Sequence, residues 1–330
     1  MLVLGIETSC DETAAAVVRN GHEVLSNVVA SSLPEHKKFG GIIPEIASRR
    51  QLEFIAAVVD QALRQARVSF KKIDCLAVTH APGLIGSLLV GISFARSLSF
   101  ALHKPLLNVN HIEAHLYACF LTSRWIKELH PIRTFLPSYF PAVGLVASGG
   151  HTCLYFMKDF THLSLIGQTR DDAAGEAFDK VARMLALGYP GGPIIDRLAQ
   201  EGENDEIHFS CADIPHSYDF SFSGIKTSVL YFLRRHPLLN HRKLTQMAYA
   251  FQKEVVSILV KKSLQLCLKC KAATLLVGGG VAANSTLRRE LARETLSHRI
   301  RLRFPPRSFC LDNAAMIASK GYFQHIRKIY

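Results

Sequence analysis

Two parts of the chain repeat one order of predicted strands and helices, and this repeat limits the fold more than any other feature. The first part runs from LVLGIE at residues 2–7 to the helix that carries His111, and the second runs from AVGLVA at residues 142–147 to the helix after Asp312. Each part starts with three short strands and then alternates helix and strand. Both therefore read as βββαβαβα. This order predicts two α/β lobes with mainly parallel sheets and an antiparallel hairpin at one edge.

The repeat also sets the expected boundaries. We expect an N-terminal lobe over residues 1–123, a connection over 124–141 and a C-terminal lobe over 142–330, with an insertion at about 187–243 and a last helix that returns towards an inter-lobe cleft. A chain of 330 residues is long for one core and comfortable for two lobes. Two such lobes resemble the actin, hexokinase and Hsp70-type (ASKHA) nucleotide-binding fold, in which the first turn of each lobe clasps phosphates.

Charge and composition narrow the class of partner. The formal net charge is +12, with basic doublets spread along the chain, which favours a polyanion such as nucleic acid because phosphate neutralisation releases counterions. The most apolar stretch, Leu84 to Leu102, contains Arg96 and several serines, so we expect a buried helix rather than a membrane span. No secretory leader is evident, and eight scattered cysteines fit a reducing cytosol. We therefore expect a cytoplasmic protein with no membrane partner.

Three glycine-rich or polar turns are candidates for ligand binding. ETSCDET at residues 7–13 and VASGGHT at 146–152 each offer hydroxyls and backbone N–H groups at a tight turn, and glycine lets backbone approach an anion. A plain hairpin explains either turn better when it is taken alone, whereas their matching places in the two lobes favour phosphate binding by the pair. VGGGVAAN at 277–284 allows a ribose or base to lie against backbone, or it is a strand-to-helix turn in which Asn284 caps the helix.

The stretch HIEAH at residues 111–115 is a candidate metal site. At about 100° per residue His111 and His115 share one helix face, whereas Glu113 points away from it. A zinc peptidase needs its glutamate next to the first histidine, so this spacing disfavours a peptidase. The repeat places Asp312 at the start of the corresponding helix. Two histidines and one aspartate suit an open iron or zinc site, although two exposed helical histidines remain the simpler alternative.

Long motifs in the order found here resemble the TsaD family of tRNA threonylcarbamoyladenosine transferases, over essentially the whole chain. They are GIETSCDETAAAVV, FGGIIPEIASRRQLE, APGLIGSLLVG, NHIEAHLYA, SGGHT, DDAAGEAFDKVARMLALGYPGGPIID, FSFSGIKT, GGGVAANSTLR and LDNAAMIA. The resemblance implies that His111, His115 and Asp312 bind one divalent metal, iron in the first instance and zinc as the alternative. The residues it assigns to the substrate are Val146, Ala147, Ser148, Gly149, Gly150, Asp179, Gly192, Asp196 and Asn284.

The resemblance also implies an activity. The family transfers the threonylcarbamoyl group of threonylcarbamoyl-AMP to the exocyclic amine of the adenine 3′ of the anticodon, in tRNAs that read codons beginning with A. The implied partners are the tRNA anticodon loop, a TsaB-like paralogue and a TsaE-like ATPase. We take Asp11 as the carboxylate that accepts a proton near the amine, with a turn-stabilising role as the alternative. A sugar or acetate kinase of the same fold, a metallopeptidase and a non-catalytic scaffold are the rival functions.

Overall fold

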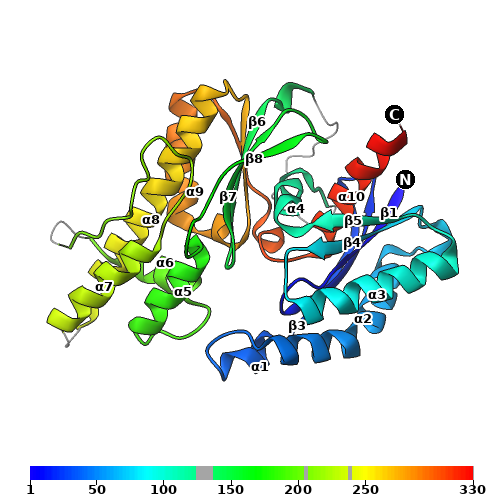
Figure 1. Ribbon diagram of the computed structural model, residues 1–330, viewed down its shortest axis with the longest axis horizontal. Helices are drawn as coiled ribbons and strands as arrows, with labels where there is room; N and C mark the ends of the chain where they lie inside the picture. The colour runs from blue at the N-terminus through cyan, green and yellow to red at the C-terminus, as the bar shows by residue number, and fades with distance from the viewer. Residues whose placement is uncertain (124–136, 204–206, 237–239, 330) are drawn as a thin grey trace. The chain divides into compact units, whose positions relative to one another are not determined.

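The computed structural model of the protein describes residues 1–123, 137–203, 207–236 and 240–329. The chain forms two compact units, one made of Met1–Phe135 together with Pro305–Tyr330 and the other of Leu136–Phe304. Each unit contains one five-stranded sheet with helices packed on it (Figure 1). Most of the predicted connection at 124–141 lies outside the described residues.

The sheet of the first unit has the strand order β3-β2-β1-β4-β5. Its strands are β1 (Leu2–Glu7), β2 (Glu12–Arg19), β3 (Glu23–Ser31), β4 (Cys75–Ala81) and β5 (Leu106–Asn110). The first three are antiparallel neighbours, and β4 and β5 run parallel to β1. The β2–β3 turn contains Asn20 and Gly21, both with positive φ, as the Asn-Gly pair predicts.

Helices cover both faces of this sheet because its central strands are apolar on both sides. The helices are α1 (Leu33–Lys37), α2 (Pro44–Ala66), α3 (Ile85–Leu102), α4 (His111–Tyr117) and α10 (Ala314–Ile329). Leu4 and Ile6 of β1 pack with α2 and α3, whereas the alternate residue Val3 packs with α4 and α10. The alternation follows from the period of two in a strand. As a result, the segment of chain before α10 lies beside α4 in one unit.

The placement of α10 differs from the predicted boundaries. We expected residues 142–330 to form the second lobe, but residues 305–330 belong with the first unit. The physical reason is burial: the side chains of Ala314, Ala315, Met316, Ile317 and Ala318 are fully buried in the core of the first sheet. A second reason is the fit at Gly5 of β1, where an added Cβ would lie 2.3 Å from the carbonyl oxygen of Ala314.

The prediction that Leu84 to Leu102 forms a buried helix was wrong in its burial. The helix is present as α3, and by length and composition it alone among the described helices could cross a membrane, yet only 17% of it is buried. Its buried residues are Ser87, Gly91 and Ala95, a stripe one turn apart that faces the sheet. Average hydropathy does not tell which side of a helix is covered, so the outward apolar side chains could not be foreseen.

The second unit repeats the strand order of the first, which confirms the predicted fold class. Its sheet is β10-β9-β6-β7-β8, with β6 (Ala142–Ala147), β7 (Thr152–Met157), β8 (Leu163–Gln168), β9 (Thr274–Gly278) and β10 (Arg301–Arg303). Its helices are α5 (Ala174–Met184), α6 (Gly191–Glu201), α7 (Ser223–Arg235), α8 (His241–Lys269) and α9 (Ser285–Ser297). Within the predicted insertion, the described residues form α6 and α7. The helix α8 packs against β6, β9 and α6.

Candidate metal centre and substrate turns

The two histidines are placed by a capped helix start. Asn110, the last residue of β5, accepts a hydrogen bond from the backbone N–H of Glu113 at 3.1 Å and so caps α4. His111 and His115 then follow one turn apart, with their rings edge to face at 4.8 Å between centroids. Both are nearly fully buried. The capped turn therefore fixes both imidazoles on one face of α4.

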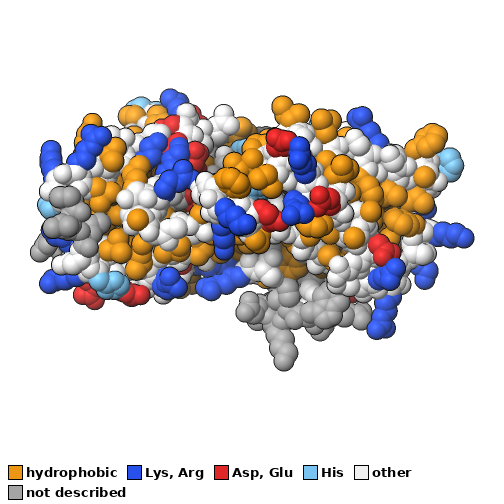
Figure 2. Space-filling view, turned by 90° about the horizontal axis from the view of Figure 1, so that it is seen from below, with side chains coloured by type: hydrophobic (Ala, Val, Ile, Leu, Met, Phe, Trp, Pro, Cys, Tyr) orange, Lys and Arg blue, Asp and Glu red, His pale blue; other side chains and the backbone are white. Residues whose placement is uncertain are grey.

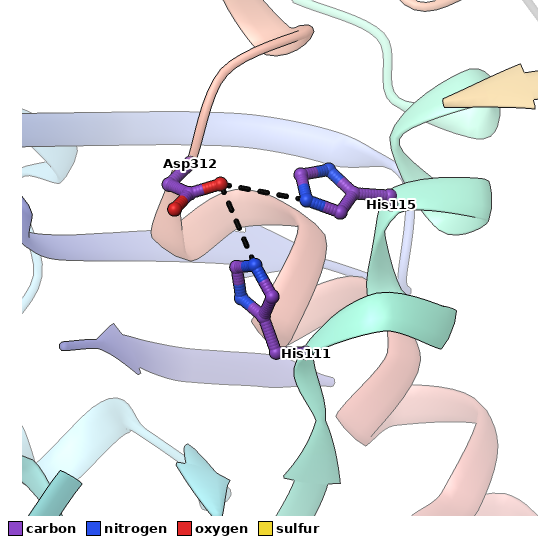
Figure 3. A group of neighbouring side chains, drawn as sticks. All are labelled: His111, His115 and Asp312. Carbon is purple, nitrogen blue, oxygen red and sulfur yellow. Dashed lines mark ion pairs between the residues drawn. The ribbon is translucent and has the colours of Figure 1, made fainter. Parts of the chain in front are cut away.

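The carboxylate comes from the segment before α10. Asp312 Oδ1 lies 3.5 Å from His111 Nε2 and 3.4 Å from His115 Nε2 (Figure 3). Asn313 fixes this segment, because its amide donates to the carbonyls of Phe309 and Leu311 and its Oδ1 accepts from Met316 N. One atom from each of the three residues lies within 4.8 Å of the others. The structure thus brings the three residues together within the first unit, where we had expected Asp312 to come from the other lobe.

The tautomer of His111 is set by Glu7. The Nδ1 of His111 lies 3.0 Å from Glu7 Oε2, and Glu7 also accepts hydrogen bonds from Thr79 Oγ1 and Ser9 N. An ionised carboxylate only accepts, so Nδ1 carries a hydrogen, and Nε2 is the ring atom that faces Asp312 and His115. Burial lowers the pKa of His111, but the charges of Asp312 and Glu7 outweigh it and raise the pKa to about 9.

The residues fit a divalent cation. Among the described residues, neither ring nitrogen of His115 has a hydrogen-bond partner although both are buried, and a buried polar atom left unpaired is costly. A cation between the three side chains would satisfy His115 Nε2. Two imidazoles and one carboxylate are donors that iron and zinc both accept, with coordination positions left for a substrate.

Glu113 does not join this cluster. Its carboxylate pairs with Lys320 of α10, whose Nζ also lies 5.2 Å from the centre of the Tyr117 ring. The pair links α4 to α10 on the side away from the histidines. The arrangement that a zinc peptidase requires is therefore not formed.

The β1–β2 turn adds carboxyl groups next to this centre. Asp11 is buried, and the charges of both Asp312 and Asp11 act on Glu12. Burial together with these two charges holds the pKa of Glu12 far above its usual range, and its side chain is hydrogen-bonded to that of Asp11. The turn therefore places two carboxyl groups side by side, and its surroundings favour the protonated form of Glu12. Sequence reasoning selected Asp11 and missed Glu12, whose place at the start of an apolar strand was the available signal.

In the second unit the SGGHT turn closes the β6–β7 hairpin. Ser148 N–H donates to the carbonyl of His151 at 2.8 Å, and Ser148 Oγ accepts from His151 N–H. An added Cβ on Gly149 or Gly150 would meet nothing within 4 Å, so the backbone there is open to a ligand. Val146 and Ala147 lie in β6 with buried side chains, which leaves only their backbone to face a substrate.

The segment after β9 and the start of α5 both pack closely against this turn. Gly279, with φ +89°, would place a Cβ 2.4 Å from the carbonyl oxygen of Ala147, and Gly175 at the start of α5 would place one 2.5 Å from that of Ser148. A side chain at Gly279 or Gly175 would therefore push its segment away from the β6–β7 hairpin. The positive φ at Gly279 further disfavours any residue with a side chain there. The VGGG segment, the start of α5 and the SGGHT turn thus form one glycine-lined edge.

The polar residues assigned to the substrate also join the helices around this edge. Asp179 accepts from Gly191 N–H at 2.7 Å, Asp196 accepts from both N–H and Oγ of Ser285, and Asn284 caps α9 through Leu287 N–H. Burial raises the pKa of Asp179 despite the backbone N–H groups of Gly191 and Gly192. Next to them, an added Cβ on Gly192 would meet nothing within 4 Å. Asp179, Asp196 and Asn284 therefore each have a structural role, whether or not they also bind a ligand.

Lys226, in the FSGIKT segment at the start of α7, is engaged in an ion pair. Lys226 Nζ lies 2.8 Å from Asp172 Oδ2, and Lys180 Nζ lies 2.7 Å from Asp172 Oδ1. Burial raises the pKa of Asp172, but its bonds to the two lysines outweigh that effect and lower it below the usual range.

Replacing Lys226 by methionine is therefore expected to cost about 1 kcal/mol of unfolding free energy at neutral pH. Because the pKa of Asp172 is depressed in the folded state, this contribution is present above the ordinary aspartate pKa and is lost as the pH falls through the depressed value. Urea unfolding of both proteins at pH 7 and pH 3 measures the difference, which should shrink in acid. Lys158→Met, at an exposed position, serves as the control, and an equal gap at both pH values would contradict the assignment.

Comparisons with known proteins give one consistent result. Residues 23–319 match the model of the family described as TsaD, tRNA N6-adenosine threonylcarbamoyltransferase. The chain is 49% identical over 330 residues to a protein of that name from Caldicellulosiruptor saccharolyticus, covering 99% of this chain and 94% of that protein. It is 48% identical over 327 residues to one from Clostridium botulinum, covering 98% and 93%.

Solved structures with low sequence identity support the fold. Component A of the (R)-2-hydroxyglutaryl-CoA dehydratase of Acidaminococcus fermentans matches with a TM-score of 0.54 at 12% identity, over 99% of both chains. Full-length HypF matches with a TM-score of 0.63 at 11% identity, over 99% of this chain and 46% of that one.

Proposed function

The chain belongs to the TsaD family of tRNA N6-adenosine threonylcarbamoyltransferases, and from that membership we propose that it moves the threonylcarbamoyl group from threonylcarbamoyl-AMP to tRNA. The acceptor is the exocyclic amine of the adenine 3′ of the anticodon in tRNAs that read ANN codons. The observation that carries the proposal is the His111–His115–Asp312 cluster, found in a chain that matches this family over nearly its whole length. A kinase of the same fold has no need of a paired-histidine ligand set.

The reaction makes one bond and breaks one. The adenine nitrogen attacks the carbonyl carbon of the threonylcarbamoyl group, a C–N bond forms, the C–O bond to the phosphate breaks and AMP leaves with its electron pair. One proton must leave the amine. Asp11, selected from the sequence, is the group proposed to accept it, with the side chain of Glu12 hydrogen-bonded beside it.

The two units are assigned different parts of this reaction. In the second unit the open backbone at Gly149, Gly150 and Gly192 suits the phosphate and ribose of the adenylate. In the first unit a divalent cation held by His111, His115 and Asp312, iron or zinc, would supply Lewis-acid polarisation of the threonylcarbamoyl carbonyl. The amine of adenine is a weak nucleophile, so holding the two reactants in place matters more than the strength of any base.

The tRNA partner accords with the charge of the chain. The formal net charge is +12, and Figure 2 shows Lys and Arg side chains spread over the drawn face among acidic and hydrophobic ones. The anticodon loop is single-stranded, so no duplex has to be opened. We assign the reaction to the cytoplasm, in keeping with a tRNA substrate. We include a TsaE-like ATPase among the partners on the strength of the family resemblance.

The assay for this function supplies threonylcarbamoyl-AMP and unmodified tRNA to the purified chain with its TsaB-like paralogue. The expected product is threonylcarbamoyladenosine, detected by mass spectrometry after nuclease digestion, at one equivalent of AMP per nucleoside formed. Absence of the nucleoside with folded protein and paralogue present would overturn the proposal.

The paralogue is proposed to bind the outward face of α2 and α3. This face exposes Leu52, Ile85 and Leu89, of which Ile85 is 79% exposed, and large apolar side chains gathered on one face mark a protein contact.

Leu89→Asp is expected to weaken binding of the paralogue at least about tenfold, measured by titration calorimetry. Leu296→Asp, an equally polar change at an exposed leucine of α9 in the other unit, should leave the affinity unchanged. Equal affinities for both variants would place the contact elsewhere.

A further inference from the structure

The β1–β2 turn is held by side chains of two helices rather than by its own backbone. Gln51 Nε2 donates to the carbonyl oxygens of Cys10 at 2.9 Å and Glu12 at 3.0 Å, and Ser87 Oγ donates to that of Cys10 at 3.1 Å. Gln51 belongs to α2 and Ser87 to the first turn of α3. The carbonyls on either side of Asp11 are therefore bound from the same two helices.

The helix α3 is also fitted closely to this turn. Its leading segment donates from Leu84 N–H to the carbonyl of Ser9 at 2.8 Å. Gly83 and Gly91 leave no room for a side chain, since an added Cβ would lie 2.5 Å from Ser9 O and 2.2 Å from Thr8 Oγ1 respectively. Small shifts of α3 would therefore be passed on to the turn.

Gln51 makes these bonds at a cost to itself. Its side chain is fully buried, and among the described residues its Oε1 has no hydrogen-bond partner. The two carbonyl acceptors fix which end of the amide carries nitrogen, so rotation cannot relieve the unpaired oxygen. A buried acceptor without a donor costs stability. Gln51 is therefore better explained as a residue that fixes the conformation of the turn than as one that stabilises the fold.

We propose that Gln51 and Ser87 are positioning residues for the transfer reaction, which set the backbone of the Cys10–Glu12 turn and thereby aim the carboxyl pair of Asp11 and Glu12. This role rests on the proposed function for its chemical meaning, since neither side chain is expected to touch the substrate. Asp11 itself is held through its carbonyl by Ser32 Oγ at 2.9 Å. With Gln51 or Ser87 removed, the turn loses one of its two side-chain anchors from α2 and α3 and gains freedom on that side.

The test uses the full chain with its paralogue and the variants Gln51→Met, Ser87→Ala and Ser87→Thr. Methionine keeps the length of glutamine without its donors, and threonine keeps the hydroxyl that alanine loses. Gln61→Met and Ser93→Ala, exposed positions on the same two helices, are the matched controls. Hydrogen–deuterium exchange of the peptide covering residues 8–13 reports the turn directly, and thermal unfolding reports stability.

Gln51→Met and Ser87→Ala are expected to speed exchange of this peptide about fivefold or more and to lower kcat about tenfold to 100-fold, as small misplacements of catalytic groups do. The KM for threonylcarbamoyl-AMP should stay within about twofold, because the adenylate is assigned to the second unit. Ser87→Thr should restore both values. Unchanged exchange, a loss of kcat matched by a rise in KM, or a threonine variant as poor as alanine would each overturn the proposal.

The exchange measurement separates this inference from the proposed function. If the wild-type chain transfers nothing while the two variants still loosen the turn and the controls do not, the positioning role stands and the proposed reaction fails. If transfer is observed but the turn is equally ordered in all variants, the reaction stands and the positioning role fails.

Discussion

Replacing His115 by alanine is expected to lower the transfer rate about 1,000-fold and to remove the bound metal. His115 Nε2 lies 3.4 Å from Asp312 Oδ1 and has no other partner among the described residues, so its loss would leave the proposed metal centre with two ligands of three. Lewis-acid polarisation is worth several kcal/mol, and each 1.36 kcal/mol is about tenfold in rate. Metal content by mass spectrometry and single-turnover transfer measure the two effects separately.

The matched control for this change is His103→Asn, at an exposed histidine with φ +53° at the end of α3, a backbone conformation that asparagine tolerates. It should keep both metal and rate. A His115→Ala protein that retains stoichiometric metal, or that transfers at the wild-type rate without it, would remove the basis for the proposed metal centre.

Replacing Gly5 by alanine is expected to destabilise the protein by about 3 kcal/mol, at the upper end of the range for overpacked sites. The added Cβ would lie 2.3 Å from the carbonyl oxygen of Ala314 and 2.8 Å from the amide nitrogen of Ala318, both in the backbone of α10. Backbone atoms cannot turn aside as a flexible side chain can, so α10 has to move away from β1. Urea unfolding followed by circular dichroism measures the change.

The same variant should bind metal more weakly, although none of the three ligands is altered. Asp312 lies two residues before α10, and a displaced helix takes it away from His111 and His115. Gly224→Ala in α7 is the control, because an added Cβ there meets nothing within 4 Å and alanine favours a helix by up to about 1 kcal/mol. A stable Gly5→Ala protein with unchanged metal affinity would contradict the packing argument.

The duplicated strand order could be predicted from the sequence because its signals are local. Short apolar runs such as LVLGIE and AVGLVA define the strands, and the Asn20-Gly21 pair adopts the positive φ angles that a tight hairpin needs. The face shared by His111 and His115 also follows from helix geometry alone. These features depend on residues within a few positions of one another.

The unit to which α10 belongs could not be predicted in the same way. The apolar side chains from Ala314 to Ala318 would suit either sheet, and only the space left by Gly5 and the neighbouring strands selects the first. The partners of the site were missed for a related reason. Glu7 reaches His111 across 104 positions and Gln51 reaches Cys10 across 41. The one feature of the sequence that pointed to these contacts was Glu7, a charged residue at the end of the apolar run LVLGIE.

The return of residues 305–330 to the first unit has a consequence for biosynthesis. The ribosome makes both histidines first, and Asp312 and the helix that anchors it follow only after the second unit has been made. A nascent chain, or a fragment released at a premature stop codon, carries an incomplete ligand set and an uncovered face of its first sheet. At the proposed metal centre, a cation would therefore meet all three side chains only after the second unit has been synthesised.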